Sequence, residues 1–284
     1  MQKDDENWDL IVKPQSSLFD IHLRELWRYR DLLVLFVRRD IVSVYKQTIL
    51  GPLWFFIQPI LTALTFTLVF GNMAGLSTDG KPRFLFYLAG ITCWNYFAEC
   101  LNLTSNTFVN NASIFGKVYF PRLISPLSII ISSLLKFLIQ FGLFLIVYLY
   151  TYSKGENVHP NHLLAFIPLL VVIMGLMGLA LGITISSFTT KYRDLRFLVS
   201  FAVQLMMYAT PVILPLSNFS GTMLVIVKYN PMTPIMETFK AAFLGIPASY
   251  DSFTLMYSSL FTVVFLFVSI LIFNKVEKSF MDTV

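Results

Sequence analysis

Two charged residues interrupt long apolar segments, where an ionised side chain is costly. Glu99 lies in the apolar run near 84–108, and Lys136 lies near the middle of the run at 123–150. Charged side chains at membrane depth usually face the interior of a helix bundle. The two residues could pair and hold neighbouring helices together, or one or both could line a hydrated pathway. The sequence leaves both interpretations open.

The other reactive residue types form no recognisable catalytic or metal centre. His159 and His162 have i, i+3 spacing, but no third ligand lies near them, so we predict no metal site. No Ser-His-Asp or Cys-His arrangement stands out, and no glycine-rich Walker motif could cradle a nucleotide phosphate. Cys93 and Cys100 would lie about 10 Å apart on one helix, too far for a disulfide. We therefore expect neither catalysis nor a bound cofactor in this chain.

The composition places these residues in an integral membrane protein. Of 284 residues, 56% are hydrophobic and only 13% are charged, about half the ~25% that a soluble domain carries. The apolar content also excludes a disordered chain. Phe is unusually frequent, with 28 copies, beside 13 Tyr and 4 Trp.

Six apolar segments are long enough to cross a bilayer as helices, which takes about 20 residues. They lie near 49–70, 84–108, 123–150, 163–188, 197–216 and 253–273. We predict an all-α integral membrane protein with a six-helix transmembrane domain over 48–284. A cytoplasmic segment over 1–47 precedes it.

The distribution of basic residues sets the orientation. If the N-terminus is inside, the inside segments carry 15 Lys and Arg and the outside loops carry 5, as the positive-inside rule requires. The sequence does not begin with a basic region followed by an apolar stretch, so we expect no cleaved signal peptide. These features predict a multi-pass membrane protein with both termini in the cytoplasm.

The segment over 22–47 is too polar to span a membrane and has the pattern of an amphipathic helix. Five of its charged residues fall within about 80° on a helical projection, although Leu32, Leu35 and Val42 interrupt that face. The charged residues on the polar face are Arg24, Arg28, Asp31, Arg38 and Lys46. We predict an interfacial helix on the cytoplasmic leaflet. Packing on another subunit is an alternative, and the two are compatible.

The outside segment over 217–251 is apolar, yet prolines break it repeatedly. Short helices that dip into the outer leaflet would explain this pattern, since irregular backbone at that depth must be buried in protein or line a wet cavity. An ordinary extracytoplasmic cap is the alternative.

Aromatic residues concentrate in the first two apolar segments. The first carries Trp54, Phe55, Phe56 and Phe66, and the second carries Tyr87, Trp94, Tyr96 and Phe97. The usual explanation for Trp and Tyr in such segments is a belt at the membrane–water interface, and the usual explanation for Phe is packing in the core. Aromatic faces also stack on the C–H surfaces of sugars, so a glycan-lining role is a further possibility.

Four groups of short motifs occur in order along the chain. They are LGPLW at 50–54 with QP at 58–59 and FTLVFG at 66–71; VYFPR at 118–122 with SP at 125–126; KYRDLRF at 191–197 with YATPVI at 208–213; and YNPMTP at 229–234. In order and spacing they resemble the membrane subunit of type-2 ABC exporters of polysaccharides, which carry lipid-linked O-antigen, capsule or teichoic acid chains across the cytoplasmic (inner) membrane. The resemblance covers nearly the whole chain from about Leu26.

This resemblance implies an N-terminal interface helix, six spans and two re-entrant helices before the last span. It also implies that two copies form an aromatic-lined channel for an undecaprenyl-diphosphate-linked polysaccharide, with O-antigen the preferred cargo. Each copy would dock on a separate ATPase subunit that binds ATP and Mg²⁺. Nucleic acid is not an expected partner.

The resemblance also implies roles for particular residues. The candidates for the channel lining are Trp54, Phe55, Phe66, Tyr87, Trp94, Tyr96 and Phe97. The candidates for ATPase coupling are Lys117, Arg122, Lys191, Tyr192, Arg193, Asp194 and Arg196. Arg24, Arg28, Arg38 and Arg39 of the interface helix would contact lipid headgroups and the partner, and Asn230, Pro231 and Pro234 would form the outside gate. Simple positive-inside anchoring is the alternative for 192–194.

Several rival functions remain. A teichoic acid or capsule exporter would share these motifs, and an ABC exporter of a lipid or drug would keep the class but change the cargo. A secondary transporter would be expected to show internal repeats or several mid-membrane charges. A membrane glycosyltransferase would need clustered carboxylates or His at the membrane surface, and the outside acidic residues are scattered.

Overall fold

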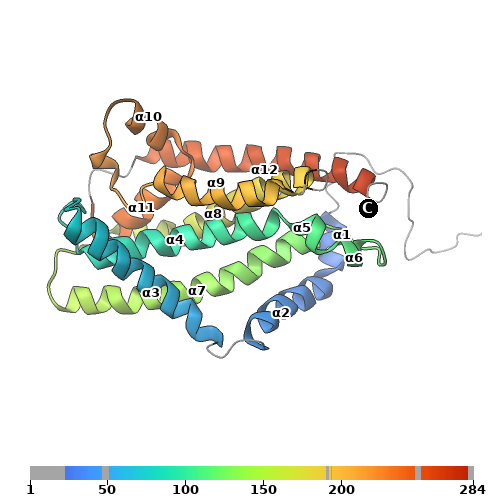
Figure 1. Cartoon of the computed structure of the whole chain (residues 1–284), viewed down its shortest axis with the longest axis horizontal. Coiled ribbons are helices and arrows are strands. Elements are labelled where there is room, and N and C mark those ends of the chain that lie inside the picture. The colour runs from blue at the N-terminus through green and yellow to red at the C-terminus, as the bar shows by residue number, and fades with distance from the viewer. Residues whose placement is uncertain (1–22, 47–50, 190–191, 193, 247–250, 281–284) are drawn as a thin grey trace, which may run out of the picture.

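The computed structural model describes residues 23–46, 51–189, 192, 194–246 and 251–280. Within these ranges every regular element is a helix, and the long helices run side by side along one axis (Figure 1). These are α3 (Trp54–Phe66), α4 (Arg83–Thr104), α7 (Ile124–Ser153), α8 (Ile167–Thr189), α9 (Leu195–Tyr208) and α12 (Ser252–Phe280). The all-α prediction is confirmed for this part of the chain.

Four helical segments of the described chain are long and apolar enough to cross a membrane. They are Trp54–Met73, Ile124–Ser153, His162–Thr189 and Ser252–Glu277. The first joins α3 to the π-helical turn η2 (Thr67–Met73), and the third joins the 3-10 turn η3 (His162–Phe166) to α8. A multi-pass membrane protein follows from these four. Helices α4 and α9 lie beside them but are more polar or shorter, and α9 has only 14 residues.

Helix α4 lies at the centre of the bundle and packs closely on α8. Gly178 makes this possible, because a Cβ there would lie 2.6 Å from Cys100 Cβ and 3.1 Å from the Phe97 carbonyl oxygen. Gly175 and Gly182 face Tyr96 and Thr104 in the same way. Small residues let two backbones approach closely, and dispersion and packing then hold the helices together in lipid.

Many of the described phenylalanines pack inside the chain. Along α7, Phe137, Phe141, Phe144 and Tyr148 follow helical spacing and form a ladder of ring contacts that reaches Phe239 and Phe243 of α11 (Met232–Leu244). A second cluster lies at the other end, where Phe108 stacks on Phe273 with ring centroids 4.6 Å apart. Ring pairs of this kind add about 0.5–1.5 kcal/mol beyond area burial.

One end of the bundle gathers the short helices α1 (Leu23–Arg28), α5 (Thr107–Asn110) and α6 (Ala112–Phe115) with the end of α12 (Figure 1). The helix expected over 22–47 is present as α1 and α2 (Arg30–Lys46). Helix α2 packs on α7, and Phe36 inserts edge-on against Phe120 with ring centroids 5.6 Å apart. The short turn η1 (Gly51–Leu53) then leads into α3.

The opposite end holds η4 (Leu216–Asn218), α10 (Gly221–Tyr229) and α11 (Figure 1). Every residue of α11 is buried, whereas α10 is mostly exposed. Gly245 ends α11 in the left-handed conformation (φ 68°), which a side chain would strain. Nearby, the Lys81 ammonium donates to Asn157 Oδ1 (3.3 Å), and burial lowers the pKa of Lys81.

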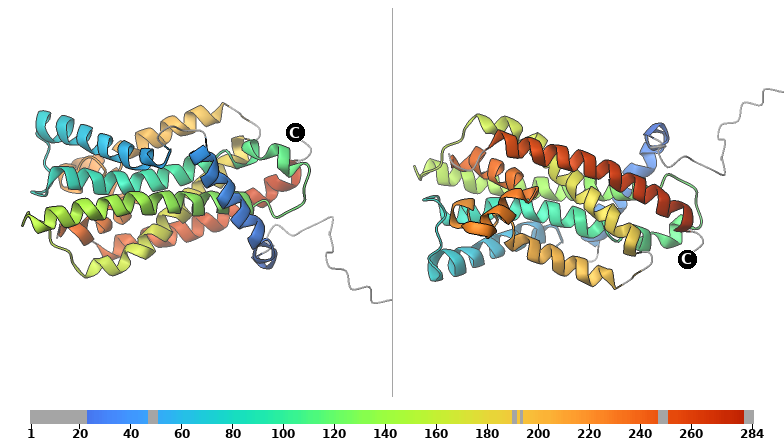
Figure 2. Two further views of the ribbon diagram at one scale, coloured as in Figure 1. Left: turned by 90° about the horizontal axis from the view of Figure 1, so that it is seen from below. Right: turned by 90° about the horizontal axis from the view of Figure 1, so that it is seen from above.

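Helices α3 and α9 lie along the same edge of the bundle in two opposite views (Figure 2). Helix α4 lies between this edge and the helices α7, α8 and α12. Both edge helices expose large apolar side chains, among them Leu61, Leu64 and Leu68 on α3 and Leu198, Phe201 and Leu205 on α9. The chain therefore presents one broad apolar edge formed by α3 and α9, which we call the α3–α9 face.

Candidate functional site

The two intramembrane charges that the sequence singled out lie side by side. The Lys136 ammonium of α7 donates to Glu99 Oε1 of α4, and both side chains stay partly exposed, 17% for Lys136 and 27% for Glu99. The ammonium also lies 5.9 Å from the Phe55 ring centroid. Of the two interpretations left open, pairing is what the structure shows. Partial exposure keeps a role in a polar pathway compatible with it.

A second polar contact lies one helical turn away. Asn95 Nδ2 of α4 donates to Gln140 Oε1 of α7 at 3.4 Å. Because Asn95 precedes Glu99 by four residues and Gln140 follows Lys136 by four, the two contacts form consecutive rungs between the same helices. The α4–α7 seam is thus polar where most of the bundle is apolar.

The candidate channel rings divide into two groups. Trp54 is 47% exposed, and Phe55 and Phe66 are half-buried, so these three α3 rings reach the surface of the chain. The four α4 rings are buried: Tyr87, Trp94, Tyr96 and Phe97. Tyr96, for example, packs on Phe137 with centroids 5.0 Å apart. Channel lining stays a prediction for all seven, and the geometry of the single chain favours the α3 rings.

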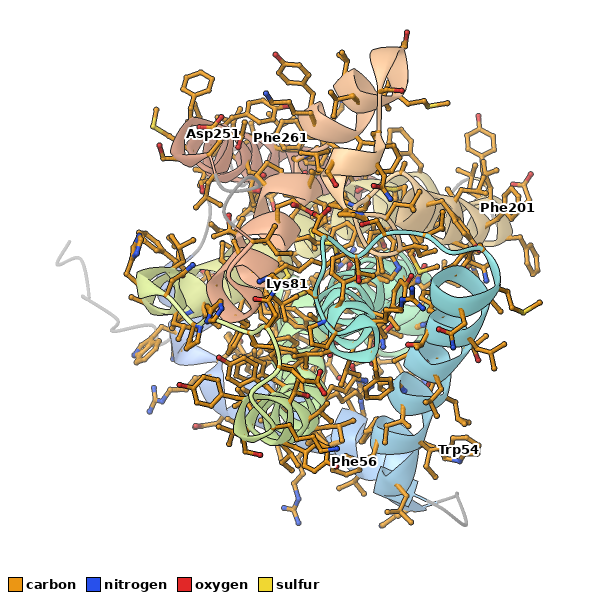
Figure 3. The ribbon with its side chains drawn as sticks, turned by 90° about the vertical axis from the view of Figure 1, so that its left-hand side faces the viewer. Trp54, Phe56, Lys81, Phe201, Asp251 and Phe261 are labelled. Atoms are coloured by element: carbon orange, nitrogen blue, oxygen red, sulfur yellow. The ribbon has the colours of Figure 1, made fainter. Side chains whose placement is uncertain are left out.

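Sequence reasoning missed a set of rings on α9. Phe197, Phe201 and Tyr208 are 83%, 57% and 57% exposed. Trp54 of α3 and Phe201 of α9 project from the same side of the molecule (Figure 3). The spacing of 197, 201 and 208 puts these rings on one helical face. This spacing in the sequence could have identified the ring-bearing face of α9.

The candidate coupling residues lie at the end of the bundle that carries α1, α6 and the end of α12. Lys117, Tyr192 and Asp194 are exposed there, and Arg196 is partly buried. Lys191 and Arg193 lie outside the described residues. The exposed side chains are accessible for contact with a partner, and their coupling role stays a prediction.

Arg122 is bound to other parts of the chain through its guanidinium. Its Nη1 donates to the Glu277 carbonyl oxygen (2.8 Å), and its Nε lies 3.7 Å from Glu277 Oε1. The guanidinium also lies 5.5 Å from the Phe115 ring centroid. Burial lowers the pKa of Arg122, and the charge of Glu277 opposes that effect. Arg122 therefore clasps the loop before α7 to the end of α12.

The interface-helix arginines are solvent-facing where they are described. Arg28, Arg38 and Arg39 are exposed, and the side chain of Arg24 lies outside the described part. Arg39 pairs with Asp40 (2.8 Å) and its guanidinium lies 4.5 Å from the Phe36 ring centroid. This arrangement leaves Arg28 and Arg38 pointing outward while Phe36 anchors the helix on the bundle.

The candidate gate residues form the corner between α10 and α11. Asn230 Nδ2 donates to the Ala209 carbonyl (3.0 Å) and its Oδ1 accepts from the Met232 amide (3.0 Å). The Pro231 carbonyl accepts from the Ser258 hydroxyl, and Pro234 is buried. The corner is thus tied to the end of α9 and to α12. Its gating role stays a prediction.

A buried charge behind this corner was missed by sequence reasoning, which counted Lys240 among outside-loop residues. Lys240 of α11 is 1% exposed, and its ammonium donates to the carbonyls of Pro211 and Val212, the latter at 3.4 Å. It also lies 3.6 Å from the Phe86 ring centroid. The carbonyls that follow α9 accept hydrogen bonds from this ammonium, which explains why a lysine can be buried there.

Comparison with known proteins agrees with this architecture. A family model described as ABC-2 type transporter matches residues 31–244. The chain is 27% identical over 266 residues to an O-antigen export system permease protein RfbA of Myxococcus xanthus, covering 92% of this chain and 98% of that protein. It is also 27% identical over 253 residues to a protein of the same name from Klebsiella pneumoniae, covering 89% and 94%.

Proposed function

The chain belongs to the ABC-2 type transporter family, and from this premise we propose that it is the membrane-spanning subunit of an ATP-driven polysaccharide exporter. The cargo we favour is a lipid-linked O-antigen, carried across the cytoplasmic (inner) membrane. The observation that carries the proposal is the extent of the match, because two relatives named as O-antigen export permeases align along at least nine-tenths of their own length.

The proposed membrane arrangement has six spans with both termini in the cytoplasm. Helices α4 and α9 join the four long apolar helices as spans. Helix α4 has 22 residues, about 33 Å at 1.5 Å per residue, which matches the hydrocarbon core. Helices α10 and α11 would be the re-entrant pair in the outer leaflet. The burial of α11 supports this, since such segments need protein around them.

Two copies would form the channel by facing each other across the α3–α9 face. The exposed rings Trp54, Phe197, Phe201 and Tyr208 support this choice of face. Such rings would offer stacking surfaces to sugar C–H groups without holding the chain tightly. The polymer would thread between the protomers with its undecaprenyl diphosphate end leading or trailing in the lipid.

ATP binding and hydrolysis would belong to a separate ATPase subunit, which would hold ATP and Mg²⁺. The exposed residues Lys117, Tyr192 and Asp194, together with α1 and α2, lie where that subunit would dock. Closure of two ATPase subunits would move α2 and the adjacent loops. Because α2 packs on α7 and its buried Phe36 ring contacts Phe120 in the loop before α7, such movement would be transmitted to the spanning helices.

Deletion of the gene in its native host tests the proposed function. Surface polysaccharide should disappear while its undecaprenyl-linked form accumulates on the cytoplasmic side, and the wild-type gene should restore export. A host carrying an inactive partner ATPase is the control and should show the same accumulation. Unchanged surface polysaccharide would contradict the proposal. Accumulation of a capsule or teichoic acid chain instead would keep the exporter and change the cargo.

A further inference from the structure

One face of α4 is polar along its cytoplasmic half. The polar residues are Asn95, Glu99, Asn102 and Asn106, with the spacing i, i+4, i+7 and i+11. This spacing places the first three side chains within about 60° of one another around the helix axis. Asn106 follows the end of α4 in the same direction. Lys136 and Gln140 of α7 join them through the two rungs described above. We call this set the polar track: Asn95, Glu99, Asn102, Asn106, Lys136 and Gln140.

The polar track faces away from the packed core of the protomer. Tyr96, Cys100 and Thr104 mark the side of α4 that meets the glycines of α8, and the track lies on roughly the opposite side. All six of its side chains are partly exposed. Helix α4 also lies next to the edge formed by α3 and α9 (Figure 2). The track lies on the α4–α7 seam beside the start of α3, where Lys136 lies 5.9 Å from the Phe55 ring centroid, so it borders the side that the proposed dimer would enclose.

The chain does not use the full hydrogen-bonding capacity of the polar track. Asn102 Oδ1 and Asn106 Oδ1 are buried in the single chain and have no hydrogen-bond partner among the described residues, so a ligand must enter the seam to reach them. The Glu99–Lys136 pair uses one carboxylate oxygen and one ammonium proton, which leaves further acceptors and donors on both groups. Polar groups at membrane depth are costly unless they meet polar partners. A ligand with hydroxyl groups would supply these partners.

We propose that the polar track binds the hydroxyl groups of the exported sugar chain as it passes α4, an inference that rests on the proposed function. The track offers carboxylate and amide acceptors beside ammonium and amide donors, and a sugar hydroxyl needs both. Its one carboxylate and one ammonium cancel in charge. An anion such as a diphosphate would instead require an excess of positive charge.

The polar track complements the rings of α3. Phe55 lies next to Lys136, so a sugar could place a C–H face on an aromatic ring and its hydroxyls on the track at the same position. Rings alone would leave the hydroxyls of a dehydrated sugar without partners. Each hydrogen bond lost in a desolvated site carries a penalty of its own, so polar contacts lower the barrier to passage.

An apolar double variant separates sugar binding from helix packing. Replacing the pair by Glu99→Leu with Lys136→Met removes both charges together, which leaves no buried charge unpaired and preserves volume. The subunit should still assemble with its ATPase and keep its thermal stability and basal ATPase rate. Export of polysaccharide should fall about tenfold, the effect of losing one to two hydrogen bonds at the barrier. Wild-type export in this variant would overturn the proposal.

A second variant decides the matter if the double variant fails to assemble. Asn102→Leu with Asn106→Leu alters the track without touching the ion pair, and export should again fall about tenfold. The control is Thr184→Val, which removes the hydroxyl that donates to Ser269 Oγ (2.8 Å) between α8 and α12. It should export normally. Equal export by the Asn variant and the control would overturn the proposal.

The same strains separate this inference from the proposed function. If the deletion strain keeps its surface polysaccharide, the proposed function fails whatever the track variants do. If the deletion abolishes surface polysaccharide and the track variants export at the wild-type rate, only the polar track fails.

Discussion

Arg122 shows how a residue with a simple sequence signature takes a specific structural role. Next to a proline at the start of a long apolar run, it has the sequence pattern of positive-inside anchoring or of an ATPase contact. In the structure its guanidinium is committed to Glu277 and Phe115, on segments that meet only in the folded chain. The sequence could not have predicted this clasp, because its partner lies 155 positions away.

We expect Arg122→Met to lower the stability of the subunit by roughly 1–3 kcal/mol, because it removes a part-buried hydrogen bond and ion pair. Lys117→Met is the matched control, since Lys117 is exposed in the same loop region before α7. Thermal unfolding of the purified protein in detergent would measure both variants. An unchanged midpoint for Arg122→Met would show that the clasp contributes nothing to stability.

The charged residues within the bundle were only partly predictable. Glu99 and Lys136 stood out because ionised groups are rare in apolar runs, but their pairing needed the register of α4 on α7. Lys240 was misjudged because its surrounding segment is broken by prolines and resembles an outside loop. Its burial depends on the carbonyls at Pro211 and Val212, which the sequence does not bring together with it.

At the scale of elements, hydrophobic runs of about 20 residues predicted the positions of the long helices well. The predicted and observed helix boundaries differ where prolines or turns end a helix. The run predicted to reach 216 gives a helix that ends at Tyr208, because Pro211 and Pro215 follow. The segment over 22–47 gives two helices that part at Tyr29. The packing of α4 on α8 depends on the glycines of α8. The sequence shows these glycines but does not show which residues of α4 they contact.

The close approach of α4 to α8 makes a prediction about Gly178. A methyl group there would meet Cys100 Cβ and the Phe97 carbonyl, so we expect Gly178→Ala to destabilise the subunit by about 1–3 kcal/mol. Gly142→Ala on α7 is the control, because a Cβ at Gly142 meets nothing within 4 Å. Alanine should be neutral or slightly stabilising there. Equal thermal midpoints for the two variants would rule out the tight α4–α8 contact.

At the scale of the whole molecule, the α3–α9 face combines exposed rings with the adjacent polar track. Polar side chains at membrane depth usually face protein or water rather than lipid. We therefore expect a second copy to cover the α3–α9 face and to border the adjacent track. The sequence shows the excess of aromatic residues, but it does not distinguish rings that pack inside a protomer from rings that point outward.

A single cysteine on this face tests the dimer. Cys93 and Cys100 are free and buried, so a cysteine introduced at Phe201 would be the accessible thiol to compare with the parent protein. Phe201→Cys should cross-link between two copies in membranes when a short bifunctional reagent is added. Val263→Cys on α12 is the control, because its side chain is equally exposed but lies away from the α3–α9 face. Cross-linking at Val263 and not at Phe201 would place the interface elsewhere.

The central claim is that this subunit, with a partner ATPase, moves a lipid-linked polysaccharide across a membrane. Its most direct test is transport in proteoliposomes that contain both subunits and an undecaprenyl-diphosphate-linked glycan, with a membrane-impermeant glycosidase reporting which side the sugar is on. We predict that ATP moves the glycan to the opposite side, and that an ATPase-inactive partner does not. Glycan that stays on its original side with ATP and an active, assembled ATPase would contradict the account.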